Sequence, residues 1–179
     1  MVLLALLAFL LLAASPSSHR DTDFSWLRPQ VAPQGWNVAR TPAGAALAYP
    51  PAWHKIETDA GTVSVAPRGP RGSFVGYLNA TPLSGDETLA NWRRFRPAHV
   101  GEEGARDVRL HASAKGLRFL TGRGSCVVDS YTTTKLRFRE IACIVAGTRG
   151  TTVVIGAAPA ADWAQRARVF ERAIASFST

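Results

Sequence analysis

Three residues of this chain have the types that a serine hydrolase needs: Ser125 as nucleophile, His111 as base and Asp129 as the carboxylate that orients the base. Such a nucleophile is weak unless a base lies within hydrogen-bonding distance and a third group holds that base in place. The surrounding sequence, Gly122–Cys126 (GRGSC), resembles a nucleophile elbow. It lacks the glycine two positions after the serine, however, and it precedes a strand rather than a helix. We therefore interpret it as a tight turn and expect no catalytic residues. A small secreted hydrolase using Ser125 is the alternative.

Metal chemistry is not indicated by the residues that could serve as ligands. A protein metal site needs several His, Cys or carboxylate groups at compatible spacing. The histidines are scattered, and the two cysteines have neither a CxxC spacing nor an HxxxH companion. We expect no metal site and no cofactor. The histidines in question are His19, His54, His99 and His111.

Cys126 and Cys143 are instead predicted to form a disulfide across a β-hairpin. They are an even pair in a chain that we expect to leave the reducing cytosol. Positions paired across an antiparallel hairpin lie at equal distances from its turn, and the midpoint of this pair falls between Thr134 and Lys135, in a polar stretch. With a two-residue turn the cysteines form a non-hydrogen-bonded pair, in which the Cα atoms approach to about 4.5 Å.

The same register predicts one unfavourable neighbour pair. It sets Val128 against Ile141, which is favourable, but it also sets Asp129 against Glu140. Like charges directly opposite each other destabilise a sheet. We therefore expect an arginine from an adjacent strand, Arg118 being the candidate, or a turn of different length.

A cluster of arginines offers the best contact for an anionic partner. Arg93, Arg94 and Arg96 follow one another closely, with acidic residues some positions earlier. The simpler interpretation is that acidic residues begin a helix and basic residues end it, which complements the helix dipole. We favour that interpretation and keep the anion contact as a candidate.

These residues must be positioned by a mainly β-structure. Asp86 is expected to cap a helix that runs to about Phe95 and that Pro97 prevents from continuing. Asp162 is expected to cap a last helix with an apolar stripe from Trp163 to Phe177. Short strands separated by turn signals are predicted at 45–49, 53–57, 62–66, 74–79, 108–112, 116–121, 126–132, 136–146 and 151–157. Short connections favour an α+β fold, an antiparallel sheet with one inserted helix and one C-terminal helix.

Two segments carry a family resemblance. Leu47–Trp53 (LAYPPAW) is similar to the opening of PsbP-like domains, and the terminal helix from Trp163 to Phe177 resembles their ending. This family shares an α-β-α sandwich with the Mog-type proteins. The resemblance covers about residues 36–178 and carries no catalytic residues. It implies a non-enzymatic binding or assembly module, and the arginine-rich composition with an export signal suits the exported actinobacterial branch.

The N-terminus indicates export. The apolar run Val2–Ala14 gives way to Ser15-Pro16. It is shorter than the roughly 20 residues that cross a bilayer, and it suits a secretory signal. We predict a signal peptide over 1–18, a polar linker over 19–35 and one domain over 36–179. Cleavage is favoured over an uncleaved anchor, so the protein is expected to be secreted or extracytoplasmic.

The charge balance is strongly basic. The net charge is +8, from 18 arginines and three lysines against 13 acidic residues. Outside the cell such a protein could attract anionic envelope polymers or acidic envelope proteins through long-range attraction. Nucleic acid is not expected as a partner of an exported protein. The sequence thus predicts a binding module at the cell envelope. A small hydrolase and a structural partner of a membrane complex are its alternatives.

Overall fold

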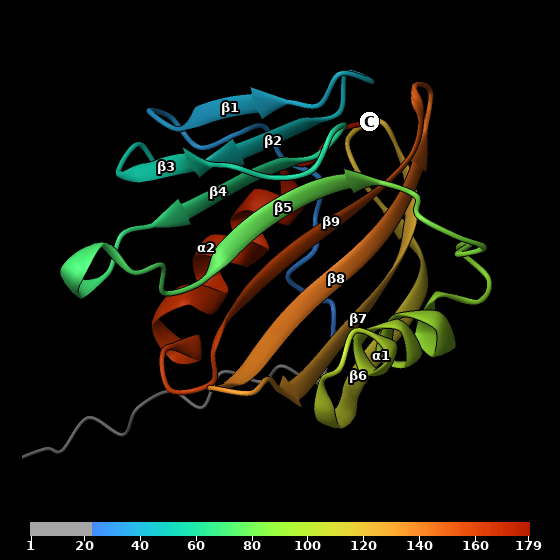
Figure 1. Ribbon diagram of the computed structural model, residues 1–179. Helices are drawn as coiled ribbons and strands as arrows, with labels where there is room; N and C mark the ends of the chain where they lie inside the picture. Colours follow the sequence, from blue (N-terminus) through green and yellow to red (C-terminus); the bar gives the residue numbers. More distant parts are fainter. Residues whose placement is uncertain (1–22) are drawn as a thin grey trace, which may run out of the picture.

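A seven-stranded antiparallel sheet in the order β3-β4-β5-β9-β8-β7-β6 forms the centre of the molecule (Figure 1). The computed structural model describes residues 23–179. A separate pair, β1 and β2, covers one corner of the sheet (Figure 1). The elements in chain order are β1 (Asn37–Arg40), β2 (Ala46–Tyr49), β3 (Trp53–Ile56), β4 (Val63–Pro67), a 3-10 turn (Pro70–Gly72), β5 (Tyr77–Pro82), α1 (Trp92–Glu102), β6 (Arg106–Arg118), β7 (Gly122–Thr132), β8 (Arg137–Gly147), β9 (Gly150–Pro159) and α2 (Trp163–Ala175).

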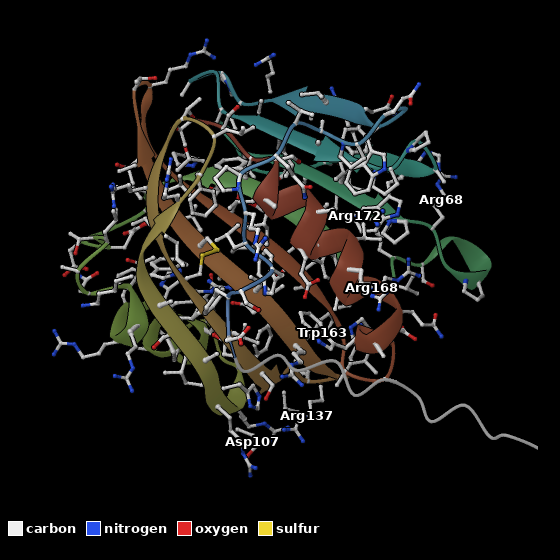
Figure 2. All side chains as sticks on the ribbon, turned by 180° about the vertical axis from the view of Figure 1, so that it is seen from behind. Arg68, Asp107, Arg137, Trp163, Arg168 and Arg172 are labelled. Carbon is white, nitrogen blue, oxygen red and sulfur yellow. A yellow bond between two sulfur atoms is a disulfide. The ribbon has the colours of Figure 1, made fainter. Side chains whose placement is uncertain are left out.

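The two helices lie on opposite faces of this sheet, which confirms the predicted α+β class (Figure 1). Helix α2, together with β1 and β2, covers one face of the sheet. The larger apolar core lies between them and the sheet. Figure 2 views the molecule from this side, with the disulfide visible beside the helix. Helix α1 covers only the part of the other face formed by β6 to β8, over a smaller cluster around Trp92. On this second face, β3, β4 and β5 therefore have no helix above them.

Helix α2 forms where the apolar stripe predicts it. Trp163, Ala167, Phe170 and Ile174 recur at helical spacing and are all buried. Phe170 lies directly over Gly156 of β9, where a Cβ atom would come within 2.7 Å of the ring. The missing side chain lets the helix approach the sheet closely.

Helix α1 differs from its prediction at both ends. It begins at Trp92, after Asn91, and continues through Pro97 to Glu102. Asp86 does not cap it, and Pro97 does not end it. Trp92, Arg96 and Val100 are spaced by four residues and buried against the sheet. We attribute the continuation of the helix to this burial, which outweighs the one backbone hydrogen bond that a proline removes.

Three of the last four strands, β6, β7 and β9, are longer than predicted. The segments predicted at 108–112 and 116–121 are largely one strand, β6, whose pairing with β7 is interrupted by register shifts. Gly116 adopts a positive φ of 69° within it, next to one of these shifts. In the first half, the segment predicted from Phe74 begins only at Tyr77. Phe74 itself is exposed.

The segment interpreted as a linker is partly built into the domain. Phe24 and Leu27 are buried in the main core, and the Gln30 amide donates to the carbonyl of Ala175. Residues 23–35 therefore belong to the folded unit, because two large apolar side chains gain burial there. The predicted signal peptide, 1–18, lies outside the described residues. Within residues 23–179, none of the helices combines the length and the apolar character that a membrane span requires.

Candidate functional site

The hydrolase set is not assembled. The Ser125 hydroxyl donates to the Leu89 carbonyl at 2.7 Å. The His111 ring nitrogen Nε2 lies 2.9 Å from the hydroxyl of Ser130. Alternate residues of a strand point to opposite faces, so Ser125 and Asp129 face α1 whereas Ser130, with His111, faces α2. The geometry does not favour the hydrolase alternative. No group of three or more potential ligands that could hold a metal ion occurs within residues 23–179.

The hairpin of β7 and β8 has the predicted register. Cys126 is paired with Cys143 and Val128 with Ile141. A disulfide joins the two cysteines, with their Cα atoms 4.1 Å apart. The Thr133 amide donates to the Leu136 carbonyl, as the two-residue turn requires. Both sulfur atoms lie in the main core on the α2 side.

The predicted like-charge pair is present, but its counter-ion comes from a helix. Asp129 lies opposite Glu140. The Arg96 guanidinium of α1 holds Glu140 with two hydrogen bonds, at 2.6 and 2.9 Å. Arg118 is exposed at the far end of β6 and lies beside Arg123, so the expectation for Arg118 is corrected. The Glu140 carboxylate raises the pKa of Arg96 even though burial opposes the charge.

Asp129 has no such partner. Its side chain is fully buried, and neither carboxyl oxygen has a hydrogen-bond partner among the described residues. Burial and the adjacent Glu140 raise the pKa of Asp129 to about 8, and Arg96 offsets this only in part. The carboxyl group is therefore mainly protonated at neutral pH. The cluster of Arg96, Glu140 and Asp129 then carries about zero net charge.

The three arginines of the candidate anion contact lie on different sides of α1. Arg93 and Arg94 are exposed on the outer side of α1, whereas Arg96 is only 7% exposed and is neutralised by Glu140. Arg96 is thus not part of one surface patch with the other two. The contact stays a prediction for Arg93 and Arg94 alone.

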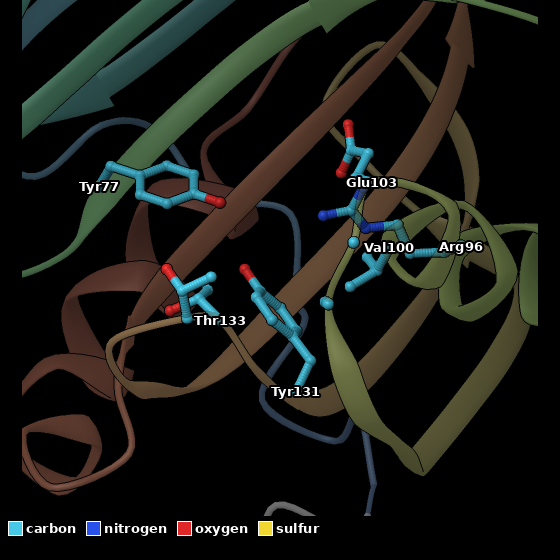
Figure 3. A pocket seen from close by; sticks show the side chains of 9 residues that line it. Tyr77, Arg96, Val100, Glu103, Tyr131 and Thr133 are labelled. Atoms are coloured by element: carbon cyan, nitrogen blue, oxygen red, sulfur yellow. The ribbon is translucent and has the colours of Figure 1, made fainter.

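A groove beside α1 is the best candidate for a functional site. It consists of two adjoining hollows of about 340 and 370 Å³, which share Tyr77, Arg96 and Glu103. It follows the uncovered part of the sheet between α1 and β5. The first hollow also includes Tyr131 and the turn at Thr133 (Figure 3). Further residues of the second hollow are Thr58, Asp59, Thr62, Asn79, Thr81, Ser84, His99 and Ile155.

Hydroxyl and amide groups dominate the chemistry of this groove. Burial, together with the charge of Glu140, raises the pKa of Tyr77 to about 12. Burial and Glu140 also raise the pKa of Tyr131. Both phenols therefore stay protonated and can donate hydrogen bonds; Figure 3 shows their hydroxyl groups pointing into the hollow. In the second hollow, Asn79 Oδ1 is buried and has no partner among the described groups, so it can accept one.

Apart from Arg96, the sequence patterns do not single out the groove residues, because they are spread from residue 58 to residue 155. One signal was available. Tyr77, Asn79 and Thr81 alternate with the buried Leu78 and Ala80 of β5. Such alternation marks a strand with one polar face, but it does not show whether that face meets solvent or a ligand.

Two helices on opposite faces of an antiparallel sheet define an α+β sandwich. Among solved structures, the chain is similar to the PsbP protein CyanoP of the cyanobacterium Synechocystis sp. PCC 6803, with 12% identity and a TM-score of 0.57 over 81% of this chain and 92% of that chain. It is also similar to LpqN of Mycobacterium tuberculosis, a protein involved in cell envelope biogenesis. That match has 12% identity and a TM-score of 0.50, over 80% of this chain and 89% of LpqN.

Neither a protein-family model nor a curated protein matches the sequence. At 12% identity the two structures show the fold alone. The chain therefore has a PsbP-like fold, and its function must be argued from its own residues.

Proposed function

We propose that this protein is an extracytoplasmic, non-enzymatic binding or assembly module of the cell envelope, and that its partner binds in the groove beside α1. The observation that carries this proposal is the uncovered, polar half of the sheet. Antiparallel sheets commonly leave one face solvated. This face instead forms a hollow with converging donors and acceptors, and a hollow with a few convergent polar groups is the usual form of a binding site.

Three further observations support the extracytoplasmic location, the non-enzymatic class and the envelope role. A disulfide persists in oxidising compartments, which suits a protein outside the cytoplasm. The hydrolase residues point to different faces, which favours binding over catalysis. The fold similarity to LpqN suits an envelope role, and we extend the proposal to the exported actinobacterial branch of PsbP-like proteins.

The partner that we propose is an envelope protein or an envelope polymer. The groove itself attracts anions only weakly, because Glu140 neutralises Arg96. An anionic polymer would instead be held by Arg93 and Arg94 on the outer side of α1. The two sites would give different salt dependence, since only exposed charges are screened strongly.

Site-specific photo-crosslinking in the native host tests the proposal. A photoreactive phenylalanine analogue is placed at Thr134 or Asp59 in the groove, at Arg94 on α1, and at Val38 on β1 as a matched exposed control. We expect adducts with an envelope component from the two groove positions and none from Val38. Mass spectrometry of the adduct then separates a protein partner, including a membrane complex, from a polymer.

Adducts from Arg94 alone would move the partner to the arginine surface and reject the groove. Equal adducts from all four positions would indicate non-specific contact and reject the proposal as well. Each variant changes a half-buried or exposed side chain, so the fold should persist, and circular dichroism checks this.

A further inference from the structure

A second polar cavity lies on the opposite face of the sheet, at the end where α2 begins. It has a volume of about 250 Å³. Its lining side chains come from β6, β7, β8 and the first turn of α2, so it shares no residue with the groove. Figure 2 shows Trp163 and Arg137 on this side of the molecule. The lining residues are His111, Ser130, Arg137, Arg139, Ala160, Trp163 and Ala164.

The sheet register brings the polar groups of this cavity together. Ser130 of β7 is paired with Arg139 of β8, and Arg137 lies two residues before Arg139, on the same face. The Arg137 guanidinium donates to the Ser130 hydroxyl at 3.4 Å. His111 of β6 approaches the same hydroxyl from the other side, at 2.9 Å. Ser130 is buried at the bottom of the cavity, and its hydroxyl contacts both His111 and Arg137.

Helix α2 closes the cavity and adds to its positive potential. The guanidinium carbon of Arg139 lies 5.5 Å from the centre of the Trp163 ring, which is a cation–π distance. This contact positions Arg139 at the cavity wall. Trp163 and Ala164 are the first two residues of a 13-residue helix, whose N-terminal end carries partial positive charge. The wall thus combines two arginines, a histidine and a helix end.

The lining carries three basic side chains, from β6 and β8, around the Ser130 hydroxyl. The donor side chains come from three neighbouring strands, and the first turn of α2 lies against them, so a ligand would be enclosed rather than contacted in one plane. That arrangement matches a tetrahedral oxyanion better than a planar carboxylate, which a single arginine fork already satisfies.

We propose that this cavity is a binding site for a phosphate group, held by Arg137 and Arg139 and contacted by His111 and Ser130. The site is separate from the groove and does not depend on the function proposed for it. The phosphate can belong to a small soluble molecule or to a lipid headgroup at the membrane surface. Both sources present the same chemistry to these residues.

Titration of the folded protein with inorganic phosphate, followed by amide chemical shifts, tests the site. We expect saturable shifts at Ser130 and Ala164. Arg137→Ala should weaken binding by about tenfold or more, since it removes charge-assisted hydrogen bonds, and Arg137→Lys should restore it in part. Arg168→Ala is the matched control, because Arg168 is an exposed arginine of α2 that does not line the cavity. It should bind phosphate as the unchanged protein does.

The proposal is overturned if phosphate produces no saturable shifts, or if Arg137→Ala and Arg168→Ala weaken binding equally, which would indicate general surface charge. Vesicles of phosphatidylglycerol, compared with phosphatidylcholine, distinguish the two sources. Binding to phosphatidylglycerol that Arg137→Ala abolishes and inorganic phosphate competes away assigns a lipid headgroup. Binding of phosphate without any binding to vesicles assigns a soluble phosphate compound.

Discussion

At the scale of single residues, the most unusual feature is the buried cluster of Arg96, Glu140 and Asp129. A charge in the protein interior is costly unless it is paired and hydrogen-bonded. Glu140 meets this condition through the two hydrogen bonds from Arg96. Asp129 does not meet it, and its raised pKa shows that protonation is the less costly state. Because the cluster lies beneath the groove, its charge state also sets the charge of the groove floor.

The Asp129 carboxyl predicts a definite dependence of stability on pH. Its pKa is about 3.8 in the unfolded chain and about 8 in the folded one, so the folded state binds more protons between these values. Its contribution to stability is therefore complete below pH 4 and is lost as the pH rises through about 8. Each pKa unit corresponds to about 1.4 kcal/mol. We expect Asp129→Asn to raise the free energy of unfolding at pH 8 relative to the unchanged protein, and to have much less effect at pH 4.

Denaturant unfolding at a series of pH values measures this difference. Asp86→Asn, at an exposed carboxylate, is the control for the loss of one carboxyl group. An effect of Asp129→Asn that is independent of pH would contradict the assignment.

Single residues also show what the sequence can and cannot establish locally. The pairing of Cys126 with Cys143 follows from counting outward from one turn, because the period of a strand is constant. The partner of Glu140 does not follow from any local rule. Arg96 is 44 residues away and reaches Glu140 only because α1 lies across β7 and β8. Local pairing rules point only to adjacent strands, as in the expectation for Arg118, and contain no information on where α1 packs.

At the scale of elements, the two helices show when a sequence pattern is sufficient to predict where a helix begins and ends. Helix α2 has a continuous apolar stripe and was predicted nearly to the residue. Helix α1 contains Pro97 and is only weakly amphipathic, so local rules ended it too early. Burial of Trp92, a tertiary effect, decided its position.

Contact between α2 and β9 gives a prediction at this scale. Gly156→Ala would place a Cβ atom within 2.8 Å of Cβ and Cγ of Phe170, a side chain that is 0% exposed and cannot move aside. We expect the free energy of unfolding to fall by about 1–3 kcal/mol, the usual cost of overpacking. Thermal unfolding should show a melting temperature lower by several degrees.

Gly101→Ala in α1 is the matched control. No atom lies within 4 Å of its added Cβ, and alanine favours a helix more than glycine does. The melting temperature should stay the same or rise slightly. A Gly156→Ala protein as stable as the unchanged one would show that α2 does not approach the sheet as closely as described.

At the scale of the whole molecule, the fold class was accessible from the sequence and the site was not. Strand length, turn residues and two helical segments predict an antiparallel sheet with one inserted helix and one C-terminal helix. The groove depends on something that no segment encodes by itself, namely that α1 is too short to cover all seven strands. Its residues Tyr77 and Tyr131 become neighbours only once β5, β9, β8 and β7 are placed in order.

Export is the property of the whole chain that now needs a direct test. Three features indicate passage out of the cytoplasm. They are the apolar run Val2–Ala14, the small residues that follow it, and the disulfide. We expect the protein recovered from the host to lie outside the cytoplasm and to lack Val2–Ala14. We also expect Cys126 and Cys143 to resist alkylation until a reductant is added. N-terminal sequencing and intact mass, with and without reduction, measure these outcomes in one sample.

Replacing Leu10 and Leu11 by arginine provides the control, because charges within the apolar run should abolish recognition as a signal. That variant should stay in the cytoplasm, keep Met1 or Val2 as its first residue and contain free thiols. A native protein that retains the run and stays bound to the membrane would show an anchor instead of a signal. Free thiols in an exported, processed protein would instead contradict the disulfide. The signal peptide and the disulfide can therefore be contradicted independently, although both predictions derive from the expectation that the domain folds outside the cytoplasm.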